Sequence, residues 1–226
     1  MMNPQFKRGI IELCVMSTLV EKDTYGYLII SDLSQYIDVN ENTIYPILRR
    51  LTSEGYFTTY LVESTEGAPR KYYKMTEKGF QDYYPDNFAH CYGCGRLNEK
   101  GLQIKSYWDG DESVCRFTPS PHHTGGFPGN IYGGLIASLI DCHCSGTAAA
   151  AKLRENGFEP GEKPISRFVT ASLKVDYLKP TPAGVELEIR GQVVEIKNRK
   201  IIVTATVAAD GIVTAKGETV MVQLPE

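Results

Sequence analysis

The segment GGFPGNIYGGLIASLIDCHCSGTAAAA, from Gly125 to Ala151, decides the fold of this chain. It begins as a glycine-rich loop and continues into small and apolar residues whose spacing predicts one long helix. The opposite side of that helix carries an apolar stripe, which predicts contact with a core. Small side chains and one carboxylate recur at the spacing of a single helical face, and they are Gly134, Ser138, Asp141, Ser145 and Ala148. This spacing alone favours neither a merely solvated Asp141 nor a ligand that approaches it closely.

The predicted start of the helix is the pair Gly133-Gly134. Free N–H groups in a first turn without side chains form a ready site for an anion or an oxyanion. Gly133 and Asp141 lie about 12 Å apart along the axis, so one small reacting group cannot touch both in one chain. Two antiparallel copies would bring Gly133 of one near Asp141 of the other. If the site is catalytic, we therefore expect it to be shared across a homodimer.

Composition is that of a globular protein, with 226 residues, a formal net charge of −3 and six cysteines. No apolar run reaches the ~18 residues of a membrane span, and Met1-Met2-Asn3 begins no signal peptide. We expect a cytoplasmic protein with reduced cysteines and no membrane partner. The net charge does not indicate a nucleic-acid binder, so that function has to be argued from local charge.

The first 84 residues predict three helices and then two strands, the arrangement of a winged helix-turn-helix. The first helix is expected to end near Glu21, and the second to span about 25–36. The third is expected over TIYPILRRLTSEG (43–55), which places Pro46 in its first turn. FTTYLVES and KYYKMT predict the two strands, and TEGAP joins them.

Positive charge gathers on the third helix and the hairpin, although residues 1–84 are slightly acidic as a whole. Five of their nine Lys and Arg residues lie where DNA phosphates would be, and these are Arg49, Arg50, Arg70, Lys71 and Lys74. The alternative is a solvated face on a protein-interaction module.

Three stretches within about residues 6–80 resemble the N-terminal domain of the PadR family of transcriptional regulators: KRGIIELCVMSTLVEKDTYGYLIISDLS, NENTIYPILRRLTSEGYFTTY and GAPRKYYKMTEKG. The resemblance implies binding of double-stranded operator DNA as a dimer. It places Thr43 and Tyr45 at the start of the recognition helix. The family continues into a helical dimerisation region after TEKG and this chain does not, so dimerisation is expected from the second half. We expect the DNA-binding domain over 1–84 and a linker over 85–90.

The segment CYGCGRLNEKGL contains a CxxC pair, Cys91 and Cys94. A structural zinc site needs four ligands, and the sequence holds no second CxxC and no HxxxH. Cys142 and Cys144 are two apart on a helix and so point to nearly opposite faces. We therefore favour a glycine turn and no metal over a zinc site. A disulfide oxidoreductase is disfavoured because no βαβ pattern follows.

Residues 85–226 predict an antiparallel sheet with the long helix on one face. LQIKSYW and ESVCRFT flank the turn at 109–111, and four further strands follow: FVTASLKVDYLK, VELEIRGQVVEI, KIIVTATVAA and IVTAKGETVMVQL. One apolar face per strand suits a sheet covered on one side. The fold class is therefore α+β, a winged helix-turn-helix followed by a hotdog domain in which a curled sheet wraps around one helix.

CYGCGRLNEKGL, FPGNIYGGLIASLIDCHCSGTAAAA and RFVTASLKVDYLKPTP, within about residues 88–224, resemble the PaaI-like branch of the hotdog thioesterase superfamily. The resemblance implies a dimer or a dimer of dimers, with acyl-CoA or another acyl thioester as ligand or substrate and no cofactor. It places the catalytic acid at Asp141 and the oxyanion N–H at Gly133. Tyr132 stands where the family has a histidine, so the chain departs from the pattern of active enzymes at that position. Tyr132 is still a candidate catalytic residue, because its hydroxyl can donate a hydrogen bond.

Other candidates lie around this site. Asn130 and His123 share the preceding loop and either orient water or hold the loop. Gly134 and Ser138 line the approach to Asp141. Lys179, with Lys174, is placed to meet CoA phosphates, although exposed lysines on strands are common. His143 faces the core side, where we expect a histidine with satisfied hydrogen bonds.

Two functions follow as expectations. The first is a transcriptional regulator whose hotdog half binds, and in one version hydrolyses, an acyl-CoA. The second is an active acyl-CoA thioesterase with an accessory DNA-binding domain. A fusion of independent parts is the third reading, and it predicts no coupling between the halves.

Overall fold

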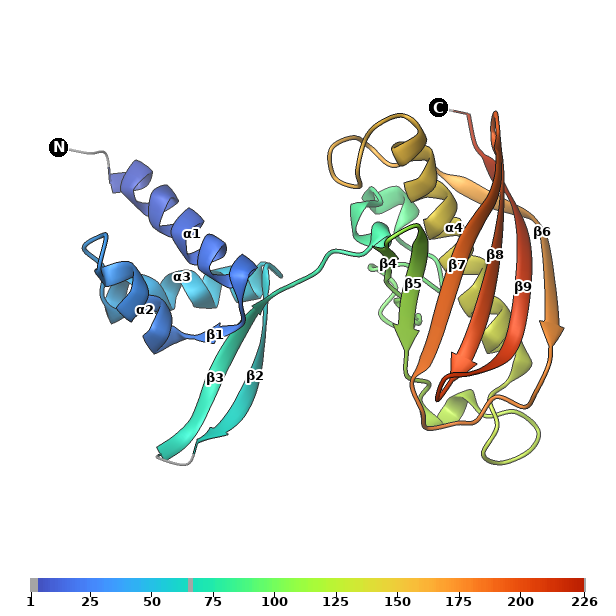
Figure 1. Ribbon diagram of the computed structural model, residues 1–226, viewed down its shortest axis with the longest axis horizontal. Coiled ribbons are helices and arrows are strands. Elements are labelled where there is room, and N and C mark those ends of the chain that lie inside the picture. The colour runs from blue at the N-terminus through green and yellow to red at the C-terminus, as the bar shows by residue number, and fades with distance from the viewer. Residues whose placement is uncertain (1–3, 65–66, 226) are drawn as a thin grey trace. The chain divides into compact units, whose positions relative to one another are not determined.

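Residues 125–151 form a loop and then most of α4 (Gly133–Glu155) in the computed structural model, which describes residues 4–64 and 67–225. The chain divides into two compact units, Met1–Glu77 and Lys78–Glu226 (Figure 1). Helix α4 begins at the predicted glycine pair. None of the helices in the described ranges has the length and apolarity that crossing a bilayer requires.

The first unit has the three helices and the β-hairpin that the sequence predicts. Its helices are α1 (Pro4–Glu21), α2 (Gly26–Ser34) and α3 (Glu41–Ser53), and its hairpin strands are β2 (Phe57–Ser64) and β3 (Gly67–Met75). A two-residue strand, β1 (Thr24–Tyr25), pairs with β3 and makes a three-stranded sheet in the order β1-β3-β2. The core of this unit contains Ile44, Leu48 and Tyr73, which brings α3 and β3 together. The predicted winged arrangement is confirmed.

Two local predictions for this unit were wrong. Helix α3 begins at Glu41, two residues before the predicted start, so Pro46 lies in its second turn rather than its first. Tyr25 belongs to β1 instead of opening α2, because β3 supplies backbone partners that local sequence does not reveal. Of the predicted turn TEGAP, residues 65–66 lie outside the described part of the chain, and 67–69 belong to β3.

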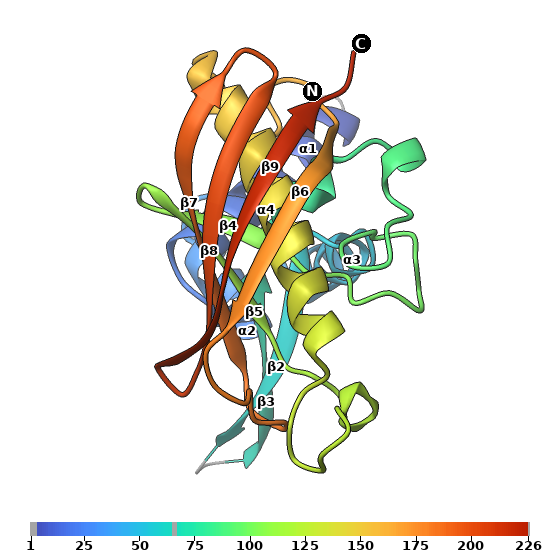
Figure 2. The ribbon, with the colours of Figure 1, turned by 90° about the vertical axis from the view of Figure 1, so that its right-hand side faces the viewer.

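The second unit is one antiparallel sheet with α4 across it. The sheet contains β4 (Ser106–Asp109), β5 (Glu112–Phe117), β6 (Phe168–Tyr177), β7 (Leu187–Lys197), β8 (Lys200–Ala209) and β9 (Ile212–Gln223) in the order β4-β5-β7-β8-β9-β6. Strands β8 and β9 are joined at Asp210 and Gly211, whose φ values of 49° and 75° suit a tight hairpin. Figure 2 shows α4 running behind the sheet, which is the predicted hotdog arrangement.

Burial alternates along the central strand β8, as its sequence predicts. Ile201, Val203 and Val207 are fully buried and point toward α4, as does the almost fully buried Ala205, whereas Ile202, Thr204 and Thr206 are partly exposed. Leu139 and Ile140 of α4 are also fully buried against this face. Removal of these apolar side chains from water is the main force that holds helix and sheet together.

The edge strand β6 departs from this pattern. The sequence predicts an apolar face on it, but Val169, Leu173 and Tyr177 are 38%, 37% and 54% exposed. Among the described residues, strand β6 pairs with β9 on one edge and with no strand on the other.

The two units divide after Glu77, earlier than the predicted boundary after residue 84. The reason is a short helical turn at Phe80–Tyr83, which packs on the second unit. Gln81 is fully buried there. Its Nε2 donates a hydrogen bond to the Ser106 hydroxyl at 2.9 Å, and its Oε1 accepts one from the Ser106 N–H at 2.8 Å. The expected linker at 85–90 also belongs to the second unit, since Asp86–Phe88 forms another turn and Ala89 is fully buried.

Candidate functional site

The face of α4 that carries Asp141 is the less buried one, as the spacing predicts. Gly134, Ser138, Asp141 and Ser145 are all partly exposed. Ala148, which was assigned to the same stripe, is fully buried instead. The open part of the face therefore extends only over the first half of the helix.

Asp141 lies in a pocket of 230 Å³ between α4, the start of β6 and residues 84–94. Its Oδ1 accepts a hydrogen bond of 2.5 Å from the Thr170 hydroxyl. A bulge in β6 between Thr170 and Ser172 changes the register just at this point. Bulges re-aim the side chains beside them, and here one is adjacent to the residue that orients the carboxylate.

The start of α4 is a separate place. The Tyr132 side chain is 60% exposed, and its ring lies against Gly134, where a Cβ would come within 2.4 Å of it. Tyr177 of β6 donates a 2.8 Å hydrogen bond to the carbonyl of Gly133. The pocket around Asp141 is lined by neither Tyr132 nor Gly133. One chain thus does not bring the predicted acid and oxyanion donor together.

Asn130 and His123 have structural contacts in the loop before α4. The Asn130 carbonyl accepts from Gly125 N–H at 2.8 Å, and Asn130 bridges to Pro182. His123 Nδ1 accepts from Ser120 N–H at 3.0 Å. Burial, and then the neighbouring His122, lower the pKa of His123.

The lysines proposed for CoA phosphates lie on or just beyond β6. The Lys179 side chain is exposed. Lys174 is paired with Asp176 at 3.0 Å and borders a hollow of 460 Å³ on the open face of the sheet. No residue of α4 lines that hollow, so it is distinct from the pocket at Asp141.

His143 is a core histidine with both ring nitrogens bonded, as predicted. It is fully buried, and Nδ1 and Nε2 lie 2.9 and 3.0 Å from the hydroxyls of Ser106 and Ser113. Burial lowers the pKa of His143 to about 4. It takes no part in the Asp141 pocket.

The CxxC segment makes a glycine turn, as expected, but that turn packs on α4. Sequence reasoning missed that Cys142 joins Cys91 and Cys94, because 51 positions separate Cys91 from Cys142. The sulfur atoms of Cys91 and Cys142 are 3.5 Å apart. Hydrogen bonds from Cys142 and then Cys94 hold the pKa of Cys91 well below its ordinary value. All three thiols line the pocket that contains Asp141.

The third helix, α3, places its two arginines in different surroundings. Arg49 is exposed on a face that also carries Asn42, Pro46 and Ser53. Arg50 is tied within the unit by ion pairs of 2.5 Å to Glu12 of α1 and 2.8 Å to Glu54. Of the two guanidinium groups, that of Arg49 lies on the exposed outer face and forms no ion pair with the described residues.

Two other predicted DNA contacts are partly buried. The Tyr45 ring packs on Gly26 of α2, where a Cβ would meet the ring at 2.6 Å. The Thr43 hydroxyl lies 3.4 Å from the Asn40 side chain, next to the start of α3. Tyr45 is thus a packing residue in this unit, whereas Thr43 lines a hollow of 480 Å³ between α1 and α3 with Lys7 and Arg8.

The β2–β3 hairpin is the wing of this unit, and its three predicted DNA-contacting cations lie on two different faces of β3. Arg70 and Lys74 share one face because alternate side chains of a strand point the same way, and Lys71 lies on the other. Arg70 also stacks on the Tyr25 ring at 4.9 Å and donates to its hydroxyl at 3.2 Å. At most two of these three cations can face one surface together.

Comparison with known proteins matches each unit separately. A model of the transcriptional regulator PadR-like family matches residues 15–83, and a model of the thioesterase superfamily matches residues 128–216. The chain is 30% identical over 76 residues to an uncharacterized protein of Lysinibacillus sphaericus, covering 32% of this chain and 70% of that protein.

Relatives of the second unit include an acyl-coenzyme A thioesterase, THEM4 of Xenopus laevis, with 35% identity over 94 residues, 42% of this chain and 36% of that protein. The chain therefore spans about a third of that thioesterase. A solved thioesterase superfamily protein from Shewanella loihica is 44% identical, with a TM-score of 0.48, over 62% of this chain and 98% of that one. This chain joins a PadR-like domain at residues 15–83 to a thioesterase superfamily domain of the hotdog fold at residues 128–216.

Proposed function

We propose that this chain is an acyl-CoA-responsive, DNA-binding transcriptional regulator. The observation that carries the proposal is that one chain holds both exposed cations on the third helix and hairpin of a PadR-like unit and a pocket with a positioned carboxylate in a thioesterase-like unit. The likeness of the second unit to an acyl-coenzyme A thioesterase supports acyl-CoA as the ligand. A regulator of this kind requires that the ligand bind the DNA-competent and DNA-free states unequally.

The DNA-binding half of the proposal rests on the outer face of α3 and on one face of the wing. Arg49 and the pair Arg70 and Lys74 are exposed cations on these two elements. In a winged helix-turn-helix, the third helix enters the major groove and the hairpin rides on the backbone. These side chains would then neutralise phosphates and release bound counterions.

Replacing Arg49 with alanine is expected to weaken DNA binding and to reduce the slope of log K against log salt by about one, as for loss of one phosphate contact. Arg50→Ala is the matched control. It removes an adjacent guanidinium that is already paired with Glu12 and Glu54, so it should lower thermal stability and leave the salt slope unchanged. Fluorescence anisotropy with duplexes selected from a random library measures both. Equal salt slopes for the two variants would contradict this assignment.

The acyl-CoA half of the proposal requires a second copy of the chain. A pocket of 230 Å³ holds only part of a thioester ligand, and Gly133 lies outside it. The pocket borders β6, whose free edge and exposed Val169 and Leu173 are suited to cover by another chain. We infer a homodimer in which Gly133 of one copy approaches Asp141 of the other. Sedimentation of a monomer at micromolar concentration would contradict it.

A coupling experiment tests the whole function. Anisotropy titrations of a selected duplex are run with saturating acyl-CoAs, with free CoA as the control ligand. We expect at least one acyl-CoA to change the DNA affinity about fivefold or more, the range of allosteric coupling. If calorimetry shows an acyl-CoA bound and the DNA affinity stays the same, the regulator proposal fails and the halves act independently.

Thioester hydrolysis is a second candidate function, favoured by the hydrogen bond between Thr170 and Asp141 within the pocket. Asp141 would take a proton from water as the water oxygen bonds to the acyl carbon. The carbon–sulfur bond then breaks, and the CoA thiolate leaves and takes up a proton. An N–H at Gly133 of the second copy would stabilise the developing oxyanion, an interaction that contributes about 3–4 kcal/mol per donor in other enzymes.

A further inference from the structure

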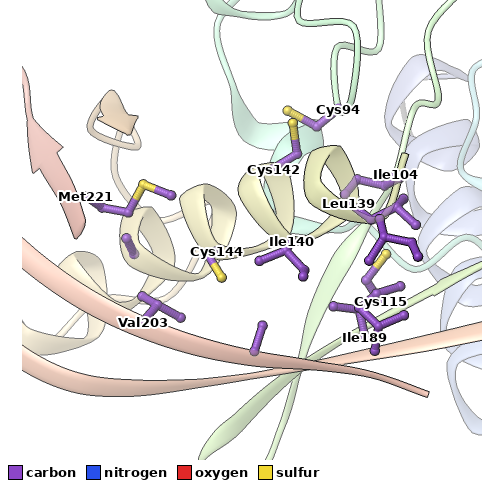
Figure 3. Close-up of a cluster of buried hydrophobic side chains, with 14 of the residues drawn as sticks. Cys94, Ile104, Cys115, Leu139, Ile140, Cys142, Cys144, Ile189, Val203 and Met221 are labelled. Carbon is purple, nitrogen blue, oxygen red and sulfur yellow. The ribbon is translucent and has the colours of Figure 1, made fainter. Parts of the chain in front are cut away.

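Three cysteine sulfurs meet beside α4 although they come from two distant segments. Cys91 and Cys94 lie in the turn that follows Asp86–Phe88, and Cys142 projects from α4. The three sulfur atoms all lie within 4.8 Å of one another. Figure 3 shows Cys94 and Cys142 together on one side of α4, whereas Cys144 points to the opposite side, toward the sheet.

The spacing of these sulfurs matches the coordination shell of a thiophilic metal. Zinc binds thiolates at about 2.3 Å with tetrahedral angles, which sets neighbouring sulfurs about 3.8 Å apart. The measured separation of Cys91 and Cys142 is 3.5 Å, and the third sulfur lies within 4.8 Å of both. An ion at the centre of the three would need only small side-chain shifts.

The backbone of the CxxC turn is built around this cluster. The N–H groups of Gly93 and Cys94 donate to the Cys91 sulfur. A Cβ at Gly93 would lie 2.3 Å from the Cys142 sulfur, so only glycine lets the turn approach α4 this closely. Backbone hydrogen bonds from Leu102 to Tyr92 and from Ile104 to Gly93, at 2.7 and 3.1 Å, hold the turn in place.

Packing alone explains the buried cysteines of this unit, but it does not explain why the exposed Cys91 lies against Cys94 and Cys142. Cys115 and Cys144 are both fully buried in the core, where each behaves as a small apolar residue. Cys91 is exposed, so it is not there to fill a core. A disulfide between Cys91 and Cys142 would use two of the sulfurs and leave Cys94 without a role.

We propose that Cys91, Cys94 and Cys142 bind a Zn²⁺ ion whose fourth position faces the pocket containing Asp141. Within the described residues, the group has no fourth histidine, cysteine or carboxylate, so water takes that position. The ion would fasten the CxxC turn to α4 and form part of the pocket wall. This site does not depend on acyl-CoA binding or on hydrolysis.

Metal analysis of the intact chain tests the proposal. The protein is purified in reducing buffer from zinc-supplemented cells, dialysed, and assayed by mass spectrometry of the metal. We expect about one zinc per chain in the wild type and in the control Cys144→Ala, which alters the same helix outside the cluster. Cys91→Ser should weaken zinc binding at least tenfold. Removing a residue that supports a metal ligand already lowers metal affinity by that much, and removing the ligand itself should lower it by at least as much.

A second measurement guards against a folding defect. Cys91 is exposed, so its serine variant should keep the wild-type circular dichroism. Replacement of zinc by Co²⁺ should give sulfur-to-cobalt charge-transfer absorption in the wild type and in Cys144→Ala, and weaken it in Cys91→Ser. Equal zinc in Cys91→Ser and wild type would overturn the proposal. So would a metal-free wild type, including one in which peptide mapping finds a disulfide between Cys91 and Cys142.

Discussion

Replacing Asp141 with asparagine is expected to lower acyl-CoA hydrolysis by a factor of about 10² to 10⁴, the contribution of a positioned general base. The asparagine oxygen can still accept the hydrogen bond from Thr170, which is 2.5 Å in the native chain. The amide cannot take a proton from water, so the chemical step loses its base while the pocket keeps its shape. Thiol release from a panel of short, medium, aromatic and dicarboxylic acyl-CoAs measures this rate.

The control is Asp176→Asn, which removes a carboxylate from β6 outside the pocket, where it pairs with Lys174. We expect it to keep hydrolysis within a few-fold of the wild type. Calorimetry should show that Asp141→Asn still binds the acyl-CoA that the wild type cleaves. Turnover retained in Asp141→Asn would remove Asp141 from the mechanism. A wild type that binds acyl-CoA without cleaving it would remove hydrolysis and leave the regulator function standing.

Acid is expected to destabilise the second unit through His143. Its pKa is lowered to about 4 by complete burial, from about 6.5 in the unfolded chain. Below pH 6.5 the unfolded chain takes up a proton that the folded one refuses, so protonation favours unfolding. This stability is fully present above about pH 6.5 and declines as the pH falls, and the total loss amounts to about 3 kcal/mol once the pH passes below 4.

Urea denaturation at pH 7, 5.5 and 4 measures this loss, with His143→Gln as the comparison. Glutamine keeps a polar side chain beside the hydroxyls of Ser106 and Ser113 and cannot be protonated in this range. Its free energy of unfolding should start lower at pH 7 and fall less steeply with acid. If wild type and variant decline in parallel between pH 6.5 and 4, another group causes the acid sensitivity.

Local regularities explain why much of the fold was predictable. The stripe of Gly134, Ser138 and Asp141 on α4 and the alternation of Ile201 and Val203 on β8 both follow from fixed backbone periods. A helix repeats about every 3.6 residues and a strand every two, whatever the rest of the chain does. Residues on one face of one element can therefore be grouped from sequence, and His143 could be assigned to the core before its partners were known.

Local patterns failed where a distant segment provides the partner. Arg50 follows Arg49 in sequence, but Glu12 of α1 pairs with Arg50, whereas Arg49 is exposed and has no ion-pair partner among the described residues. The apolar residues of β6 alternate properly and yet remain exposed, because β6 is the edge of the sheet. Neither outcome follows from the residues alone, since each depends on the order in which elements pack.

By itself, the sequence determined the two units, the long helix, the alternating strands and the open face that carries Asp141, because backbone geometry imposes these patterns locally. Only the tertiary structure decided that Thr170 holds Asp141 across 29 positions and that Cys142 meets Cys91 across 51. The physical reason is that such contacts arise when a whole sheet and helix pack together. Burial of their shared core offsets the entropy lost when distant parts of the chain are brought together.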